Sequence, residues 1–283
     1  MRQRESGIPF VLPALTAVAL VTFYPLLFVV YLSLRRELPI FGVSRFTGLD
    51  NLLFLIRDDR FWNALGNTLY FTVTSVSLEL LLGMAVALLL QRPFRFRGVA
   101  RAVVLLPWAI PTVVSARMWE WIFNSDFGVM NRLLGIGVNW LGSPFWAMHA
   151  AVIADVWKTT PFVAVILMAG LQAIPADIYR AARTDGAGSA AIFLRITLPL
   201  LRPVILVVLL FRTLDAFRVF DAVYVLTGGG PANTTETLSI YAYKVLFQTL
   251  QFGYGSALAM TVFLCTGLIS AGYIRVLMGR GER

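Results

Sequence analysis

Charged residues are scarce in this chain: they make up 14% of its 283 residues, whereas 58% are hydrophobic. Soluble domains average about 25% charged and roughly 45–50% apolar residues, so the composition excludes an ordinary soluble class. Cysteine and histidine occur once each, at Cys265 and His149. This excludes an intrachain disulfide framework and a metal site built from a cysteine or histidine cluster. The sequence therefore indicates an integral membrane protein.

Lysine is also rare. The two lysines, Lys158 and Lys244, are not preceded by the glycine that a phosphate-binding loop of the G-x-x-x-x-G-K-[ST] kind requires. If transport through this chain is driven by ATP, the nucleotide must bind to a separate polypeptide. An intramembrane enzyme has no support, because the chain lacks an H-E-x-x-H motif, a second histidine, and a serine or cysteine placed beside a base.

The sequence contains six long apolar segments. They run over residues 8–34, 68–90, 99–123, 145–171, 200–226 and 256–277. Each exceeds the ~20 residues that cross a ~30 Å hydrocarbon core as a helix. The first is too long for a secretory signal, whose apolar core has about 7–15 residues, so we interpret it as a retained helix. We therefore predict an all-α, polytopic membrane protein with six transmembrane helices. The charged segment 35–67 is expected to be an external loop with short amphipathic pieces.

The net charge of +9 is typical of nucleic-acid binders, but its placement indicates a lipid bilayer as the partner instead. The only basic residue in segment 124–144 is Arg132, and the only one in segment 227–255 is Lys244. The positive-inside rule places both termini and the loop 176–199 in the cytoplasm, although five arginines in segment 35–67 are a local exception. The basic residues on the predicted cytoplasmic side are Arg92, Arg95, Arg97, Arg101, Arg180, Arg183, Arg195, Arg202, Arg275, Arg280 and Arg283, and Arg2 and Arg4 precede the first span.

A polar island lies between the fourth and fifth apolar segments. Residues 176–184 are good helix formers, and Gly186 and Gly188 supply positions where a helix can end. A second short run, 190–196, leads into Pro199. We expect an ordered loop outside the bilayer, because its scattered charges are costly in hydrocarbon.

This island resembles the signature loop of ABC importer permeases, and the resemblance covers about residues 67–274. The matching residues are Ala181, Ala182, Asp185, Gly186, Ala187, Phe193, Leu198 and Pro199. The resemblance implies an ABC importer type I transmembrane domain at 67–278, preceded by a helix and external loop at 1–66 and followed by a cytoplasmic tail at 279–283. It further implies that Arg180, Ala181, Ala182, Asp185, Gly186 and Ala187 form a coupling helix that docks on an ATPase. Arg180 replaces the family's glutamate, which leaves the charge pairing at the ATPase open.

The same resemblance implies the partners. They are a homologous second permease subunit, an ATPase dimer that binds ATP and Mg, and an extracytoplasmic sugar-binding protein; this chain would hold no cofactor itself. The segment 226–242, with its Thr-Gly-Gly-Gly-Pro turn, is similar to the carbohydrate-uptake branch of maltose and glycerol-phosphate permeases, in which this surface receives the binding protein. That branch suggests a disaccharide such as trehalose or maltose as the substrate.

Ionisable residues inside the spans are candidates for the substrate path. Arg212, Asp215, Arg218 and Asp221 recur at steps of three, with alternating sign, in the fifth span. One hypothesis is that Asp215 and Arg218, with Phe217 or Phe220, line a sugar cavity, since charged groups hydrogen-bond hydroxyls and rings pack on a sugar face. The other is a structural ladder of ion pairs between helices. An ion-coupled secondary transporter, with this stripe as its coupling site, is the alternative function.

Other charged residues in the spans have their own predictions. The spacing favours local pairs for Asp155 with Lys158 and for Arg117 with Glu120. Both Asp155 and Lys158 are also assigned to the substrate path, and Glu79 is left open between pairing and cavity lining. His149 is expected to be a hydrogen-bonded interfacial residue. Three prolines, Pro107, Pro111 and Pro161, are expected to kink their spans.

Overall fold

The computed structural model describes residues 8–278; Arg2, Arg4, Arg280, Arg283 and the predicted tail 279–283 lie outside the described residues. The chain divides into two compact units. One comprises Met1–Phe61 with Tyr241–Leu264, and the other comprises Trp62–Ile240 with Cys265–Arg283.

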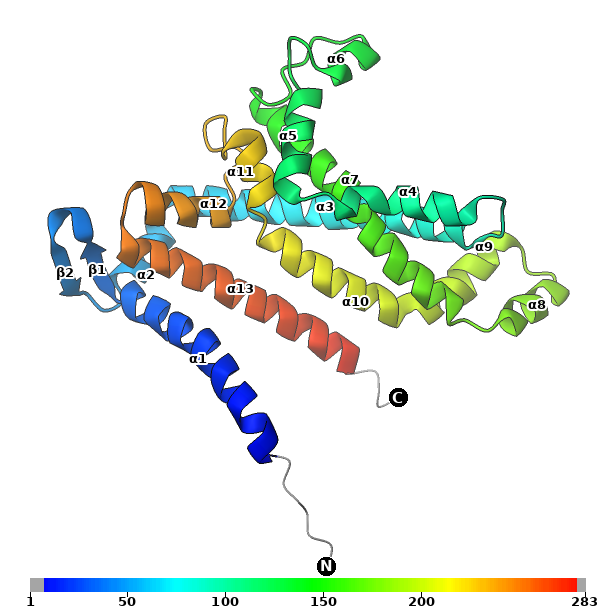
Figure 1. Ribbon diagram of the computed structural model, residues 1–283, viewed down its shortest axis with the longest axis horizontal. Helices are drawn as coiled ribbons and strands as arrows, with labels where there is room; N and C mark the ends of the chain where they lie inside the picture. The colour runs from blue at the N-terminus through cyan, green and yellow to red at the C-terminus, as the bar shows by residue number, and fades with distance from the viewer. Residues whose placement is uncertain (1–7, 279–283) are drawn as a thin grey trace, which may run out of the picture. The chain divides into compact units, whose positions relative to one another are not determined.

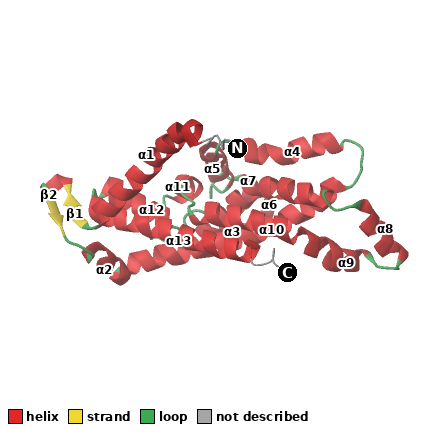
Figure 2. Cartoon of the chain, turned by 90° about the horizontal axis from the view of Figure 1, so that it is seen from below, coloured by secondary structure: helices red, strands yellow, loops and turns green. Residues whose placement is uncertain are grey.

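The first unit begins with helix α1 (Ile8–Ser33), which leads almost directly into a β-hairpin (Figure 1). Strands β1 (Arg35–Leu38) and β2 (Val43–Phe46) pair antiparallel around a 3₁₀ turn that ends at Gly42, with φ of 61°. Helix α2 (Asp50–Arg57) follows. The sequence predicted amphipathic pieces here but missed the hairpin. Its two strands, yellow in Figure 2, form the only sheet within residues 8–278.

The carboxylate of Asp58, just after α2, connects two later segments of this unit through hydrogen bonds. The hydroxyls of Tyr241, 2.5 Å away, and of Tyr254 both donate to Oδ2 of Asp58, while the Arg60 guanidinium lies 4.7 Å from the centre of the Tyr241 ring. Burial, together with the Asp58 carboxylate, raises the pKa of the Tyr241 phenol, which keeps it a donor. Tyr254 belongs to helix α13 (Phe252–Met278), whose first residues lie in this unit.

The second unit is a bundle of long helices with shorter ones at its ends. Its long elements are most of α3 (Asp59–Gln91), α7 (Pro144–Gln172) and α10 (Leu198–Phe217); α10 continues from α9 (Ser189–Ile192) through a π-helical turn at Phe193–Thr197. The shorter helices are α4 (Arg97–Ala109), α5 (Thr112–Ile122), α6 (Val129–Leu134), α8 (Ala176–Thr184) and α11 (Asp221–Thr227). Helix α12 (Leu238–Tyr243) begins in this unit and ends in the first, which also contains a π-helical turn at Lys244–Gln248. The predicted run 190–196 is therefore helical, and the wider π turn lets the helix continue past Pro199 into α10.

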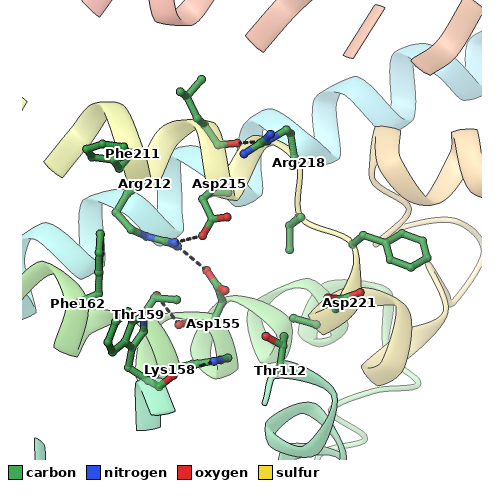
Figure 3. Close-up of a pocket in the computed structure, with 16 residues that line it drawn as sticks. Thr112, Asp155, Lys158, Thr159, Phe162, Phe211, Arg212, Asp215, Arg218 and Asp221 are labelled. Atoms are coloured by element: carbon green, nitrogen blue, oxygen red, sulfur yellow. Dashed lines mark hydrogen bonds and ion pairs between the residues drawn. The ribbon is translucent and has the colours of Figure 1, made fainter. Parts of the chain in front are cut away.

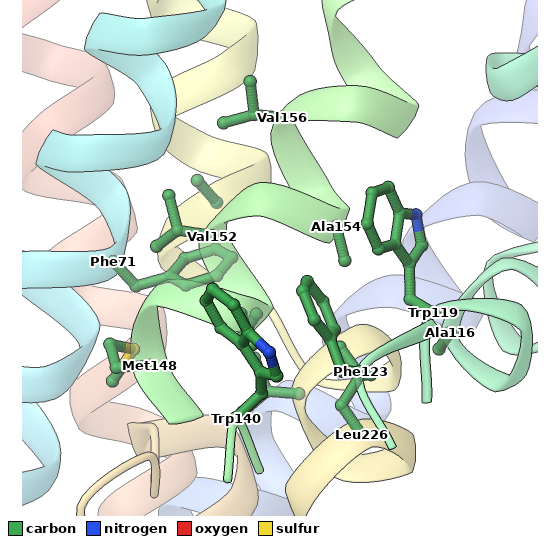
Figure 4. Packing of buried hydrophobic residues seen from close by; sticks show 14 of the residues in the cluster. Phe71, Ala116, Trp119, Phe123, Trp140, Met148, Val152, Ala154, Val156 and Leu226 are labelled. Atoms are coloured by element: carbon green, nitrogen blue, oxygen red, sulfur yellow. The ribbon is translucent and has the colours of Figure 1, made fainter. Parts of the chain in front are cut away.

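Two buried apolar clusters hold this bundle. One gathers aromatic and small residues of α3, α5, α7 and α11, such as Phe71 and Trp119, together with Phe123 just after α5 and Trp140 in the loop before α7 (Figure 4). The other joins α3, α7 and α10. At Gly83 a Cβ would lie 2.6 Å from Cγ1 of Val163, and at Gly170 one would lie 2.9 Å from side-chain atoms of Leu201 and Val204. Glycine therefore sets the close spacing of these three helices, as small residues do in membrane bundles.

Within residues 8–278, five helices are long and apolar enough to cross a membrane: residues 11–33 and 59–91, then Pro144–Gln172, 189–217 and Phe252–Met278. The pair α4 and α5 makes a sixth span when it is counted as one, and it is bent by 94°. The six-span, all-α prediction is thus confirmed, with two corrections to the sequence-based expectation. The third span is broken at Ile110 and Pro111 rather than only kinked, and the fifth ends at Phe217 rather than near 226.

Candidate substrate cavity and coupling helix

Arg212 of α10 is the centre of a buried ionic cluster, which we call the Arg212 cluster: Glu79, Asp155, Arg212 and Asp215. Its Nε and Nη2 lie 2.5 and 2.8 Å from the two oxygens of Glu79 on α3. Nη2 also lies 3.2 Å from Asp155 on α7, and Nη1 lies 2.5 Å from Asp215 one turn further along α10. One guanidinium therefore joins three membrane helices, and its planar fork suits such multidentate pairing.

The cluster runs from the protein interior to an open cavity. The side chains of Glu79 and Arg212 are 0% and 4% exposed, whereas that of Asp215 is 69% exposed. Thr159 Oγ1 lies 2.6 Å from the Glu79 carboxylate and completes its surroundings. Burying several charges is costly unless they are paired and hydrogen-bonded, as they are here. The arrangement fixes Asp215 so that its carboxylate faces the cavity (Figure 3).

The cavity, which we call the central cavity, has a volume of about 610 Å³ and lies among α4, α5, α7, α10 and α11. Polar and ionisable groups share its lining with aromatic rings. The lining side chains that carry chemistry are Trp108, Thr112, Asp155, Lys158, Phe162, Phe211, Arg212, Asp215, Arg218, Phe220 and Asp221. Counting the ionisable ones gives three acids and three bases, a balance that suits an uncharged, hydroxyl-rich ligand.

The local pair predicted for Asp155 and Lys158 is wrong. Asp155 pairs with Arg212, and Lys158 Nζ instead donates to the backbone carbonyls of Ile110, at 2.9 Å, and Trp108, at 3.5 Å. These carbonyls lie at the end of α4, where a cation satisfies groups that the helix leaves without partners. Lys158 therefore holds the α4–α5 bend against α7.

The four-residue stripe predicted on one helix is also interrupted. Helix α10 ends at Phe217, Arg218 donates from Nε to the carbonyl of Leu214, and Asp221 begins α11. Within the described residues, Arg212 and Asp215 form the ion pair that the ladder hypothesis predicts and Arg218 and Asp221 form none, while all four residues line the central cavity. Phe217 is 2% exposed and lies outside that lining, so of the two predicted rings it is Phe220 that faces the central cavity.

Several predictions outside the cluster are settled by contacts. Arg117 and Glu120 form the predicted pair at 2.6 Å. His149 is hydrogen-bonded, through Nδ1 to the Phe145 carbonyl and through Nε2 to the Tyr70 hydroxyl. The sequence-based prediction missed four residues of the cavity lining: Trp108, Thr112, Phe162 and Phe211. Pro111 was a signal for the first two, because a proline that breaks a helix in a membrane span often borders a cavity.

Helix α8 coincides with the predicted run 176–184, and its end explains the Asp-Gly-Ala sequence. Asp185 caps the helix, Gly186 follows with φ of 78°, and the amide of Ala187 donates to the Ala182 carbonyl at 3.0 Å. The Gly186 amide donates to the Arg183 carbonyl at 3.1 Å. This is a Schellman cap, in which the left-handed position favours glycine. The motif therefore fixes the angle at which the chain leaves α8.

Most of α8 is exposed. Ala182 is buried, whereas Arg180 is exposed and its guanidinium pairs with the exposed carboxylate of Asp177. Beside the helix, a cavity of about 450 Å³ is lined by Tyr179 and Arg183 together with residues of α3, α7 and the π turn. The helix thus presents one face to the bundle and leaves the other, with Arg180, open.

The glycine-rich loop that follows α11 is anchored to α3. Gly228 and Gly229 have positive φ, and Thr235, Glu236 and Thr237 are fully buried. The Asn67 amide donates to the carbonyls of Asn233, at 3.0 Å, and Glu236, at 3.1 Å. This loop is therefore a fixed part of the bundle surface.

The sequence matches, over residues 79–282, the family described as the binding-protein-dependent transport system inner membrane component. The chain belongs to this family. The permease is 44% identical to the trehalose/maltose transport system permease of Thermococcus litoralis, over 100% of this chain and 96% of that protein. It is 39% identical to the trehalose transport system permease of Mycobacterium tuberculosis, over 98% and 90% of the two chains.

The permease also has the fold of a solved transporter component. It superposes with a TM-score of 0.83 on a chain of a bacterial ABC transporter involved in the import of the acidic polysaccharide alginate, at 22% identity, covering 96% of this chain and 94% of that one. At that identity the likeness shows the fold. The permease is thus the transmembrane component of an ABC importer, and its matched region includes the whole Arg212 cluster and α8.

Proposed function

We propose that the permease carries an uncharged sugar of about disaccharide size, such as trehalose or maltose, across the cytoplasmic membrane by alternating access. The names of its relatives support this: besides the Thermococcus litoralis and Mycobacterium tuberculosis permeases, a Rhizobium radiobacter relative, 34% identical, is a lactose transport system permease. The observation that carries the proposal is the central cavity, with its balanced charges and its aromatic walls.

In this proposal the cavity side chains have distinct roles. The exposed carboxylates of Asp215 and Asp221 accept hydrogen bonds from sugar hydroxyls, and Arg218 donates to them. The Phe220 ring packs on the apolar face of a sugar ring. Asp155 and Lys158 support the wall, because each is held by a protein partner.

The energy comes from outside the chain. We propose that α8 and its cap, through Arg180, Ala181, Ala182, Asp185, Gly186 and Ala187, dock on a separate ATPase dimer that binds ATP and Mg. A homologous second permease completes the pathway, and a sugar-binding protein delivers the substrate at the glycine-rich loop. Both termini are then cytoplasmic. Membership of a binding-protein-dependent family favours this mechanism over ion-coupled secondary transport.

Reconstitution tests the energy source. Vesicles that contain the permease pair, the ATPase and the binding protein should accumulate labelled trehalose or maltose only when ATP is present on the side that carries the ATPase. Vesicles with the permease alone and an imposed proton or sodium gradient should show no uptake. Uptake driven by the gradient alone would contradict the proposal.

Asp215 tests the role of the central cavity. Asp215→Asn should lower sugar uptake on the order of tenfold, because a charged acceptor becomes a neutral amide. Assembly should persist, since Arg212 keeps Glu79 and Asp155. Uptake by the reconstituted complex and its elution as one species measure the two effects. Asp126→Asn, an exposed carboxylate outside the cavity lining, is the matched control; loss of the assembled complex in Asp215→Asn would favour a purely structural ladder.

A further inference from the structure

A second pocket, which we call the hairpin pocket, lies in the first unit and takes no part in the proposed transport path. Its volume is about 410 Å³, and its walls come from both strands, from α2 and from the start of α13. Its lining includes Arg36, Arg45, Asn51, Thr249, Gln251 and Tyr254. Its acidic members are Glu37 and Asp50.

The two arginines of this pocket are directly opposed. In the hairpin register Arg36 is the partner of Arg45, so the two side chains leave the same face of adjacent strands. Both are exposed, and within residues 8–278 neither guanidinium has a hydrogen bond or ion pair. Like charges in directly opposed positions destabilise a strand pair. The hairpin therefore carries a repulsion that an anion between the two guanidiniums would remove.

The other face of the hairpin shows that this lack of partners is local. There Arg35 lies 3.6 Å from Glu37, and Arg35 Nη2 and the Glu37 carboxylate both contact the Ser44 hydroxyl, at 2.8 and 2.6 Å. Glu37 is thereby engaged with Arg35, which leaves Asp50 as the remaining acid against Arg36 and Arg45. The hairpin pocket keeps a net positive charge.

The pocket walls are firmly built. The Asn51 amide donates to the carbonyls of Ser33 and Arg35, both at 2.8 Å, which fixes α2 to the junction of α1 and β1. A Cβ at Gly253 would lie 2.0 Å from the Arg35 carbonyl oxygen, so the start of α13 packs directly on the same junction. Shape and charge are thus present before a ligand arrives.

The position of the pocket relative to the spans identifies the source of the anion. The candidate span of α1 ends at Ser33 and that of α13 begins at Phe252, and the pocket is lined by residues at or immediately beyond these ends. We therefore expect it to lie at the level of the lipid headgroups. At the hairpin tip Ile40 and Phe41 are 64% and 76% exposed, and basic residues beside exposed apolar ones are typical of segments at the membrane interface.

We propose that the hairpin pocket binds the phosphate of an anionic phospholipid headgroup between Arg36 and Arg45. Guanidinium forks match phosphate oxygens, and the Gln251 side-chain amide, which also lines the pocket, offers a further donor to the headgroup. The proposal accounts for Arg36 and Arg45, two of the five arginines in segment 35–67 that depart from the positive-inside rule. It is independent of which sugar is transported.

The test measures lipid retention by the purified full chain. Native mass spectrometry should detect one phosphatidylglycerol that stays bound to the wild type and to the control variant Arg57→Gln. Arg57 is an exposed arginine of the same unit that lies outside the pocket lining. Arg36→Gln/Arg45→Gln should weaken that retention on the order of tenfold, because two cations near an anionic headgroup are lost. Equal retention by the double variant would overturn the proposal.

Two further arms distinguish a bound phospholipid from a bound free phosphate and from a purely structural role of the arginines. Diacylglycerol with the same acyl chains, which lacks the phosphate, should not be retained, and inorganic phosphate at equal concentration should not displace phosphatidylglycerol. Either failure would overturn the lipid assignment, the second in favour of a free-phosphate site. In lipid-free detergent the double variant should unfold at the same temperature as the wild type or higher, since repulsion is relieved; a lower temperature would indicate a structural role instead.

Discussion

Arg212→Met should destabilise the permease by about 3–5 kcal/mol, because removing one partner of a buried ionic group leaves the others uncompensated. Glu79, with a fully buried side chain, would lose both of its short contacts to the guanidinium, and Asp155 would lose its contact as well. Thermal unfolding of the purified chain in detergent measures the loss. We also expect a fall in the yield of folded protein, since a loss of this size is a large part of a typical stability.

Two variants show whether the ionic contacts are the cause. Arg218→Met removes an exposed guanidinium just past the end of the same helix and should change stability by no more than about 0.5 kcal/mol, as surface substitutions usually do. Arg212→Met combined with Glu79→Leu should recover part of the loss, because apolar replacements for a buried ion pair are often tolerated. An Arg212→Met protein as stable as the wild type would contradict the role given to the Arg212 cluster.

Gly186→Val should lower sugar uptake and sugar-stimulated ATP hydrolysis by the reconstituted complex on the order of tenfold, while membrane insertion stays normal. The φ of Gly186 is 78°, and an L-residue held in this left-handed region costs about 1–2 kcal/mol. Because the loop after α8 is exposed, we expect valine to release this strain by changing the backbone conformation of the loop, which breaks the cap. The chain would then leave α8 at a different angle, and the proposed contact with the ATPase would shift.

Gly188→Val is the matched control for this change. Gly188 has φ of −70°, which any residue adopts, and a Cβ there meets no atom within 4 Å, as is also true at Gly186. The two glycines therefore differ in backbone conformation and not in available space. Normal transport by Gly186→Val, or equal loss in both variants, would count against the cap as the feature that sets the docking angle.

The elements that the sequence predicts well are those specified locally. Residues 176–184 form α8 as expected, because helix formers are followed by a glycine that suits the left-handed cap. The pair Arg117 and Glu120 also forms as expected, since a spacing of three residues on one helix is sufficient to bring the groups together. The apolar spans belong to the same class, because their length alone meets the thickness of the bilayer.

The features that the sequence could not provide depend on contacts between distant residues. Asp155 lies three residues from Lys158, yet it pairs with Arg212, because the packing of α7 on α10 brings that guanidinium closer to it than helix spacing can show. The end of α10 at Phe217 is marked by neither proline nor glycine, so the apolar pattern continues through it. The hairpin pocket likewise exists only when the ends of α1 and α13 meet.

The close glycine contacts of Gly83 and Gly170 have a mechanical consequence for transport. Together with the Arg212 cluster they join α3, α7 and α10 at several heights, so we expect this side of the central cavity to tilt as one stiff wall. The opposite side contains the bent pair α4 and α5, whose elbow carbonyls are held by Lys158. We therefore expect the cavity to open to one side of the membrane and then to the other through a change in the α4–α5 bend, while α3, α7 and α10 keep their mutual packing.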